Sequence, residues 1–338
     1  MAKKFPSELR YDIVSGDWVL IATGRAKRPE AFKIREKRKI KISKKECPFC
    51  NIETQEKPIL IFSKGKKINE LKNWTTAVIP NKYPALVPKR KIKKRREGKF
   101  YRIISGVGYC ELVVTRDHQK HFPHFEIWQI KEVFDAYQER YLDLMKKPHV
   151  NYISIFHNYG QEAGASQPHP HSQIITTPLI DVDLKKALFK SEQYFKANKK
   201  CIYCEMNEFE VKKRERIVFE NEDFLALCPF ASKSAFQVII SPKFHSSNFE
   251  EISEDQKLKL AEAFQAVMRK IYKALDDPPY NFYLHTSPCD GKKYPFYHWH
   301  FTILPKTATP AGFELGTRIE ISTIEPEKAA QFLRKQKI

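Results

Sequence analysis

Long apolar runs are absent from this sequence of 338 residues. A membrane-spanning helix needs about 20 consecutive, mostly apolar residues, and the sequence has no such stretch. The start of the chain, Met1-Ala2-Lys3-Lys4, lacks the apolar and small-residue regions of a secretory signal. We therefore expect a cytoplasmic protein that does not span a membrane.

The sequence also has too few scattered cysteines for a disulfide framework. Of its seven cysteines, four lie in two CxxC pairs, which fits a reducing compartment. Cys110, Cys228 and Cys289 stand alone, and we interpret them as buried or incidental thiols.

Acidic residues are fewer than basic ones: the sequence has 40 Asp and Glu and 60 Lys and Arg, which gives a formal net charge of +20. Much of the excess lies in two runs, Lys33–Lys45 and Lys89–Arg96, which we interpret as solvated insertion loops. A positive field would also favour the capture of anionic substrates. Nucleic-acid binding is an alternative that we do not favour, because the runs lack interleaved aromatics and no nucleic-acid-binding motif occurs.

The most informative residues form an HxH motif that continues into an amide. On an extended strand, His169, His171 and Gln173 would point to the same face. Buried strands rarely carry polar side chains at three positions of one face, because each buried polar group needs a hydrogen-bond partner. The segment 160–166, rich in Gly and Ser, precedes them. Two imidazoles and an amide beside flexible backbone are suited to a phosphorus centre.

An internal repeat organises the whole chain. Cys47-Pro48-Phe49-Cys50 is matched by Cys201-Ile202-Tyr203-Cys204. After each pair come an apolar run that ends in a histidine, a helical segment, another strand and an HxH motif. The histidines are His118, His169 and His171 in the first copy and His245, His298 and His300 in the second.

The segments between these histidines predict one long helix in each half. Apolar residues recur every three or four positions over 127–144 and 260–274, and Ser253 with Gln256 indicates a capping box. We expect an α+β fold of two fused halves, 1–195 and 196–338, each an antiparallel sheet that carries one long helix.

Each half also offers two cysteines and two histidines for a metal ion. Structural zinc is four-coordinate, accepts thiolate and imidazole, and favours CxxC spacing for two of its ligands. Reduced thiols packed as small hydrophobes would explain one pair, but not two in matching repeat positions. A thioredoxin-like redox motif lacks its usual sequence setting. We predict two zinc sites, formed by Cys47, Cys50, His118 and His169 and by Cys201, Cys204, His245 and His298.

If His169 binds zinc, His171 stays free on the same face. A neutral imidazole can attack phosphorus and form a covalent intermediate. Gln173, Ser166 and the backbone N–H groups of Gly164, Ala165 and Ser166 would then hold the phosphoryl oxygens. The carbonyl of His169 or a neighbour would accept the other ring proton of His171. The alternative is a hydrogen-bonded structural histidine.

Residues 164–173, Gly-Ala-Ser-Gln-Pro-His-Pro-His-Ser-Gln, resemble the active-site motif of the galactose-1-phosphate uridylyltransferases, a branch of the histidine triad superfamily. The resemblance covers nearly the whole chain. It includes Asp17-Trp18-Val19-Leu20 followed by Arg25-Ala26-Lys27-Arg28-Pro29. It also includes Ile79-Pro80-Asn81-Lys82-Tyr83-Pro84-Ala85 and Phe156-His157-Asn158-Tyr159-Gly160.

The resemblance implies histidine-triad-like halves, of which the second is degenerate, and a homodimer. It implies that His171 takes up a nucleotide from a nucleotide sugar and passes it to a phosphate-bearing acceptor. Gln173 would steady this adduct. The other implied roles are phosphate contacts for Ser166 and Asn158, a ribose contact for Asn81, and positive charge near a phosphate from Arg25 and Arg28.

Three features depart from the uridylyltransferase pattern and resemble ADP-glucose phosphorylases or other relatives. Lys82 follows Asn81 where many uridylyltransferases have an acidic residue. Residues 311–317, Ala-Gly-Phe-Glu-Leu-Gly-Thr, are similar to the phosphorylases, whereas uridylyltransferases carry a lysine and a tyrosine at Gly312 and Thr317. The second CxxC pair is also typical of the phosphorylases.

We predict a nucleotidyltransferase, first of all a UDP-glucose–hexose-1-phosphate uridylyltransferase. An ADP-glucose phosphorylase that uses inorganic phosphate is the alternative. A nucleotide hydrolase and a zinc-stabilised binding module are further readings. In the hydrolase, water would consume the adduct on His171; in the binding module, His171 would be idle.

Overall fold

A computed structural model describes residues 7–22, 32 and 42–338 of the chain. Arg25 and Arg28 lie outside the described residues, as does most of the basic run Lys33–Lys45. Among the described residues, no helix has both the length and the apolar character needed to cross a membrane.

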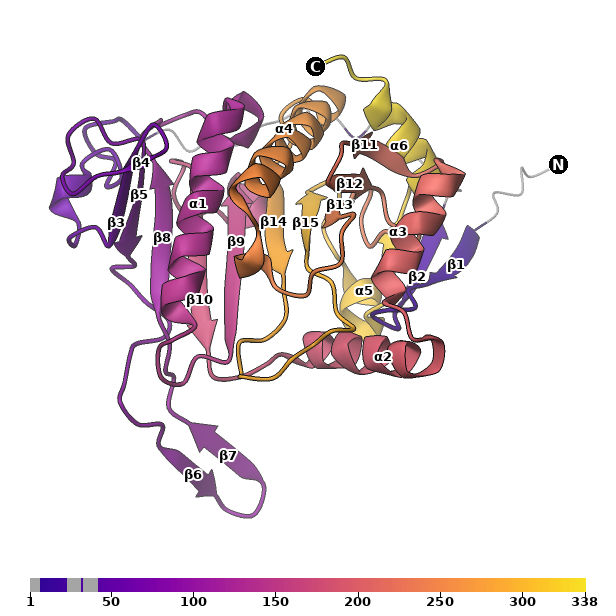
Figure 1. The fold of residues 1–338 in the computed structure, drawn as a ribbon, viewed down its shortest axis with the longest axis horizontal. Coiled ribbons are helices and arrows are strands. Elements are labelled where there is room, and N and C mark those ends of the chain that lie inside the picture. The colour runs from indigo at the N-terminus through magenta and orange to yellow at the C-terminus, as the bar shows by residue number, and fades with distance from the viewer. Residues whose placement is uncertain (1–6, 23–31, 33–41) are drawn as a thin grey trace.

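An eleven-stranded antiparallel sheet forms the centre of the molecule (Figure 1). In sheet order its strands are β11 (Ile217–Glu220), β12 (Phe224–Leu227), β13 (Val238–Pro242), β15 (His300–Pro305), β14 (Tyr280–His285), β9 (Tyr152–Tyr159), β10 (His171–Thr177), β8 (Cys110–Thr115), β5 (Thr76–Pro80), β3 (Leu60–Ser63) and β4 (Lys66–Lys67). The predicted repeat is visible in this order, because β8, β10 and β9 of the first half mirror β13, β15 and β14 of the second. The predicted α+β class, with an antiparallel sheet in each half, is confirmed.

The two half-sheets join at β9 and β14, which pair antiparallel. Phe156 lies opposite Tyr283, and Asn158 lies opposite Asn281. Because β9 and β14 pair, the strand that would be the edge of each half-sheet becomes an interior strand of the shared sheet.

One long helix from each half covers the same face of this sheet. Helices α1 (Ile127–Leu144) and α4 (Glu254–Leu275) pack against each other over the central strands (Figure 1). Ser253 caps α4, because its hydroxyl accepts the N–H of Gln256 and the Gln256 side chain accepts the N–H of Ser253. The predicted apolar stripes are buried in one core cluster that spans both halves; its members include Ile130, Phe134, Tyr137, Tyr141, Leu144, Leu260, Phe264, Val267 and Ile271.

The remaining elements lie around this core. A small sheet combines β1 (Ser7–Tyr11), β2 (Trp18–Ala22) and β16 (Glu320–Ser322). The other helices are α2 (Val182–Asn198), α3 (Ile202–Lys213), α5 (Gly312–Thr317) and α6 (Pro326–Arg334), and short 3₁₀ turns are η3 (Ile52–Thr54), η4 (Phe122–His124), η5 (Gln161–Ala163) and η6 (Phe249–Glu251).

The basic run Lys89–Arg96 is not wholly a loop, which corrects the prediction. Strand β6 (Lys94–Glu97) begins within it and pairs with β7 (Tyr101–Ile104), and this hairpin extends away from the sheet (Figure 1). Gly98 has a φ of 59° in the turn, and a hairpin with both faces in solvent needs no apolar alternation. Periodicity therefore gave no signal for this strand.

A tight turn at Gly160 connects β9 to the segment that leads into β10. Gly160 has φ 84° and ψ 152°, a conformation open essentially only to glycine. A Cβ there would lie 2.7 Å from the Cβ of Pro279, which precedes β14. Gly164, four residues later, has φ 83° and ψ 15°, and a Cβ there would meet nothing within 4 Å. Pro279 of the second half therefore leaves no room for a side chain at Gly160, whereas a side chain at Gly164 would meet no neighbour.

The glycine pair gives a matched test of this packing. Gly164→Ala should lower the unfolding free energy by roughly 1–2 kcal/mol, because the only unfavourable effect is that alanine must adopt the left-handed backbone conformation. Gly160→Ala should cost roughly 2–5 kcal/mol, because steric overlap with Pro279 adds to a worse backbone conformation. Urea unfolding of both variants measures the difference. Equal losses would show that the Pro279 contact does not constrain the turn.

Candidate functional site

Strand β10 presents different chemistry on its two faces. Ser172 and Ile174 are buried, and the Ser172 hydroxyl accepts a 2.5 Å hydrogen bond from Tyr137 of α1. Because side chains alternate along a strand, His171 and Gln173 take the face opposite α1 and α4. Gln173 is half-buried, and the His171 side chain is 9% exposed. The candidate site is therefore on the face of the sheet that the long helices leave uncovered.

The His171 ring is held in one tautomer. Its Nδ1 lies 3.0 Å from the carbonyl oxygen of His169, and a carbonyl can only accept, so Nδ1 carries the proton. The other nitrogen, Nε2, then has an unprotonated lone pair, and no described residue forms a hydrogen bond with it. Burial lowers the pKa of His171, which keeps the ring neutral near pH 7. A neutral, oriented imidazole with a free Nε2 is a competent nucleophile.

Asn81 lies beside strand β8, near the end of β8 that is farther from His171. It follows β5, and its backbone N–H donates to the carbonyl of Cys110, whereas His171 lies opposite Val114 on the same strand β8. Four strand residues separate these positions, which corresponds to roughly 13 Å. Gln173 is opposite Leu112, between them. This span is of the size of a nucleoside monophosphate.

The segment 160–166 shows one departure from expectation. The backbone N–H groups of Gly164 and Ala165 donate to the carbonyls of Gln161 and Gly160, at 2.9 and 3.1 Å. These two groups are already engaged within the turn, which corrects the prediction that they would hold phosphoryl oxygens. Ser166 is exposed, and within the described part of the chain neither its N–H nor its hydroxyl has a hydrogen-bond partner.

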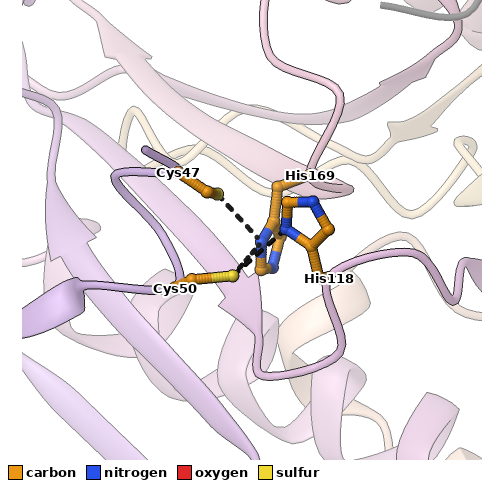
Figure 2. A group of neighbouring side chains, drawn as sticks. All are labelled: Cys47, Cys50, His118 and His169. Atoms are coloured by element: carbon orange, nitrogen blue, oxygen red, sulfur yellow. Dashed lines mark hydrogen bonds between the residues drawn. The ribbon is translucent and has the colours of Figure 1, made fainter. Parts of the chain in front are cut away.

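Cys47, Cys50, His118 and His169 converge on one point (Figure 2). Their ligand atoms all lie within 4.8 Å of one another. The Cys47 Sγ to His169 Nδ1 distance is 3.4 Å, and Cys50 Sγ lies 3.1 Å from His118 Nδ1 and 3.6 Å from His169 Nδ1. A tetrahedral ion with bonds of 2.0–2.3 Å needs ligand separations of roughly 3.3–3.8 Å. Two of the three distances fall in this range and the third is slightly shorter, so small side-chain shifts would let the four residues hold a metal ion.

The outer nitrogens of the two histidines support the same conclusion. His118 Nε2 lies 2.9 Å from the carbonyl of Ile42, and His169 Nε2 lies 2.7 Å from that of Thr115. Both carbonyls can only accept, so both Nε2 atoms are protonated, and the Nδ1 lone pairs face the thiols. Backbone carbonyls commonly orient metal-binding histidines in this way.

Cys201, Cys204, His245 and His298 form a second group of the same kind. Cys204 Sγ lies 3.4 Å from His245 Nδ1 and 3.6 Å from His298 Nδ1. His298 Nε2 contacts the carbonyl of Pro242 at 2.9 Å, as its repeat counterpart contacts that of Thr115. The structure thus brings together both sets of four residues that the sequence analysis selected.

The second HxH motif has different neighbours from the first. His300 Nδ1 contacts the carbonyl of His298 at 3.2 Å, but its ring packs against His285 and Tyr203, with centroid distances of 4.6 and 5.8 Å. No segment rich in Gly and Ser precedes this motif. The second half therefore repeats the histidine geometry without an equivalent Gly- and Ser-containing segment beside it.

The sequence analysis missed Phe49, which lies inside the first CxxC pair. Its ring centroid is 4.9 Å from that of His171 and 5.6 Å from that of His169. Tyr203 occupies the matching position in the second pair and lies 6.0 Å from His298. The shared aromatic between the cysteines was the available signal. It also missed Asn281, whose amide contacts Asn158 across β14 and β9.

Comparisons with known proteins agree with this geometry. The family model described as galactose-1-phosphate uridyl transferase, N-terminal domain, matches residues 2–180. A second model, for a domain of unknown function, matches residues 115–336.

Two relatives are similar over nearly their whole lengths. ADP-glucose phosphorylase of Arabidopsis thaliana is 32% identical over 97% of this chain and 92% of that protein. Galactose-1-phosphate uridylyltransferase of Thermotoga maritima is 31% identical over 98% of this chain and 99% of that protein.

Solved structures show the same likeness. The Arabidopsis thaliana ADP-glucose phosphorylase with bound ADP-glucose superposes with a TM-score of 0.81 at 28% identity, covering 98% of this chain and 100% of that one. A uridylyltransferase structure gives a TM-score of 0.74 at 25% identity, covering 97% of both chains. With this family model over more than half of its length, and with these full-length relatives, the chain belongs to the galactose-1-phosphate uridyl transferase family of nucleotidyltransferases.

Proposed function

We propose that the protein is a UDP-glucose–hexose-1-phosphate uridylyltransferase that works through a covalent nucleotidyl intermediate on His171. The observation that carries this proposal is the orientation of the His171 ring, with Nδ1 bound to the His169 carbonyl and Nε2 free. The 31% identity to the Thermotoga maritima galactose-1-phosphate uridylyltransferase, over nearly the full length of both proteins, supports the substrate class.

In the first step, Nε2 of His171 attacks the α-phosphorus of the nucleotide sugar. The new N–P bond forms as the bond from phosphorus to the bridging oxygen breaks, and the sugar 1-phosphate leaves with the electron pair. The ring acquires positive charge, which the carbonyl oxygen of His169 stabilises through Nδ1–H. The attack needs no general base, because Nε2 of His171 is already unprotonated.

In the second step, a phosphate oxygen of the acceptor attacks the same phosphorus. The N–P bond breaks, and its electron pair returns to Nε2 of His171. The product is a new nucleoside diphosphate compound, and no proton is gained or lost by the protein. The chemistry is therefore ping-pong, with one covalent intermediate shared by both half-reactions.

We assign the phosphoryl oxygens to the amide donors of Gln173 and Asn158 and to the Ser166 hydroxyl. Gln173 follows His171 on the same face of β10, and Asn158 lies on the neighbouring strand β9. Ser166 has no partner within the described residues that would compete with a ligand. Donors that are positioned in advance stabilise charge as it develops in the transition state.

We further propose that zinc occupies both Cys/His groups, each as a four-coordinate structural ion. In the first half, Cys47, Cys50, His118 and His169 would hold it. The ion would supply a crosslink between the CxxC segment, the segment after β8 and the segment before β10. This crosslink fixes His169, whose carbonyl orients His171, and holds Phe49 against the His171 ring.

The residues near the C-terminal end favour a second candidate, an ADP-glucose phosphorylase-type enzyme. A hexose 1-phosphate acceptor needs groups that bind sugar hydroxyls, and the resemblance described for residues 311–317 is to the phosphorylases, without the lysine and tyrosine that it implies for uridylyltransferases at Gly312 and Thr317. Gly312 offers no side chain at the start of α5. The 32% identity to the Arabidopsis thaliana phosphorylase points the same way. Inorganic phosphate as acceptor would need no sugar-binding groups.

We also propose that residues 1–195 form the catalytic half and 196–338 a supporting half, and that the active protein is a homodimer. Under this proposal Arg25 and Arg28 supply positive charge to a phosphate.

His171→Ala should abolish formation of the covalent adduct, because no other described residue presents a free imidazole nitrogen on that face of β10. Intact-protein mass spectrometry after brief incubation with a nucleotide sugar measures the adduct. His300→Ala, at the matching repeat position, is the control and should still form it. An adduct on folded His171→Ala protein would show that the nucleophile is another residue.

The same measurement separates the two candidate functions. UDP-glucose should leave a UMP-sized adduct that disappears when galactose 1-phosphate is added. If ADP-glucose instead leaves an AMP-sized adduct that inorganic phosphate discharges, the phosphorylase-type function is correct. An adduct that disappears without any acceptor would indicate a hydrolase.

Purified protein should contain two zinc ions per chain, and Cys47→Ser should contain one. The variant should also unfold at a lower temperature, because metal ligation contributes to folding free energy. Elemental analysis and thermal unfolding measure both effects. Cys110→Ser, which changes a buried thiol outside both groups, is the control and should retain two ions. Unchanged metal content in Cys47→Ser would contradict the first site.

A further inference from the structure

Asn281 comes from the second half of the chain but reaches the catalytic half. It lies on β14, directly opposite Asn158 on β9. Its Nδ2 atom lies 2.7 Å from Oδ1 of Asn158 and 2.8 Å from the backbone carbonyl oxygen of Ala163. A single amide group therefore joins β14, β9 and the turn that leads to the HxH motif.

The chemistry of these contacts fixes how both amides are oriented. The Ala163 carbonyl can only accept, so the Asn281 atom that faces it must be the NH₂ group. The same NH₂ group faces the Asn158 amide, so the Asn158 atom on that side must be its oxygen. This leaves the NH₂ group of Asn158 pointing elsewhere. Within the described part of the chain, no hydrogen bond engages that group.

The freed NH₂ group of Asn158 lies in the neighbourhood of the nucleophile. Ser172 and His157 form the final pair between β10 and β9, and His171 and Asn158 are the residues that come next to this pair on the two strands. His171 and Asn158 both lie on the side of the sheet opposite their buried neighbours Ser172 and His157. A phosphoryl group bonded to His171 would therefore have an Asn158 donor on the adjacent strand.

The second contact of Asn281 restrains the turn itself. Ala163 is buried and ends the short helix η5, three residues before Ser166. Gly160, at the start of this turn, packs against Pro279 of the same strand region as Asn281. The turn is thus held at both ends by residues of the second half.

We propose that Asn281 is a positioning residue for nucleotidyl transfer. It orients the Asn158 amide so that a donor faces the phosphoryl group, and it holds the turn that carries Ser166. The second half of the chain thereby contributes to the catalytic geometry although no segment rich in Gly and Ser precedes its own HxH motif. This inference rests on the proposed function of His171.

Asn281→Asp provides a sharp test because it keeps size and shape but removes the donor. An aspartate would place a carboxylate against two acceptor oxygens, so the Asn158 amide would turn its oxygen toward the ligand or the turn would shift. We expect the rate constant of adduct formation to fall roughly ten- to a hundredfold, the loss typical of one misplaced donor. The affinity for UMP and AMP, measured by calorimetry, should fall as well.

Asn151→Asp is the matched control. Asn151 is also half-buried, and its Nδ2 donates to a backbone carbonyl, that of Pro178, at 2.8 Å. It lies before β9, at the end of that strand away from Asn158, so the same substitution should leave adduct formation and nucleotide affinity unchanged. Zinc content and the unfolding temperature of both variants report on general damage.

A double-mutant cycle tests whether Asn281 acts through Asn158. Asn281→Ala should slow adduct formation in the wild-type background and have a markedly smaller effect in the Asn158→Ala background. Fully additive effects would overturn the proposed route through Asn158. Unchanged rate and affinity in Asn281→Asp would overturn the proposal altogether.

The two levels of proposal fail in different ways. If the wild-type protein forms no adduct, the covalent mechanism is wrong, and the calorimetric comparison still decides whether Asn281 orients a phosphate-binding group. If the wild-type protein forms the adduct and Asn281→Asp forms it equally fast, only the role of Asn281 is wrong.

Discussion

The antiparallel pairing of β9 with β14 is the constraint on which the rest of the molecule depends. Each of these strands would otherwise be an edge, with unpaired N–H and C=O groups. Their pairing turns two half-sheets into one sheet and lets α1 and α4 pack together over it in a common core. It also places Asn281 opposite Asn158 and Pro279 against Gly160, so that the second half contacts the turn that leads from β9 toward β10.

Strand β10 shows how core and chemistry share one element. Ser172 faces α1 and satisfies the buried hydroxyl of Tyr137, which would cost about 1–3 kcal/mol if left without a partner. His171 and Gln173 face the other way, toward the CxxC segment and Phe49. Any shift of β10 by one residue would exchange these two faces, so the burial of the core side also fixes the register of His171.

Local patterns were enough to predict the elements and residues whose signal is contained in neighbouring positions. The apolar stripes of α1 and α4, the cap at Ser253 and both Cys/His groups follow from spacing and from the repeat. The patterns failed where the signal was not local. Strand β6 lies in a basic run without alternation, and the engaged N–H groups of Gly164 and Ala165 depend on the way the turn closes on itself. Phe49 could have been predicted as a site residue, because Tyr203 occupies the matching position in the second CxxC pair.

The sequence by itself determined which groups the protein has for chemistry: the HxH motif, the paired CxxC segments, the repeat that relates them, and an α+β class. These follow from short-range spacing, which strand and helix periodicity convert directly into shared faces. Only the tertiary structure decided that the two halves share one sheet and that Asn281 orients Asn158. It also decided that the carbonyls of Thr115 and Pro242 set the tautomers of His169 and His298. Such contacts join residues that are far apart in the chain. They depend on the order of the strands in the sheet and on which atom of each group can donate a hydrogen bond. The local spacing of residues in the sequence predicts neither.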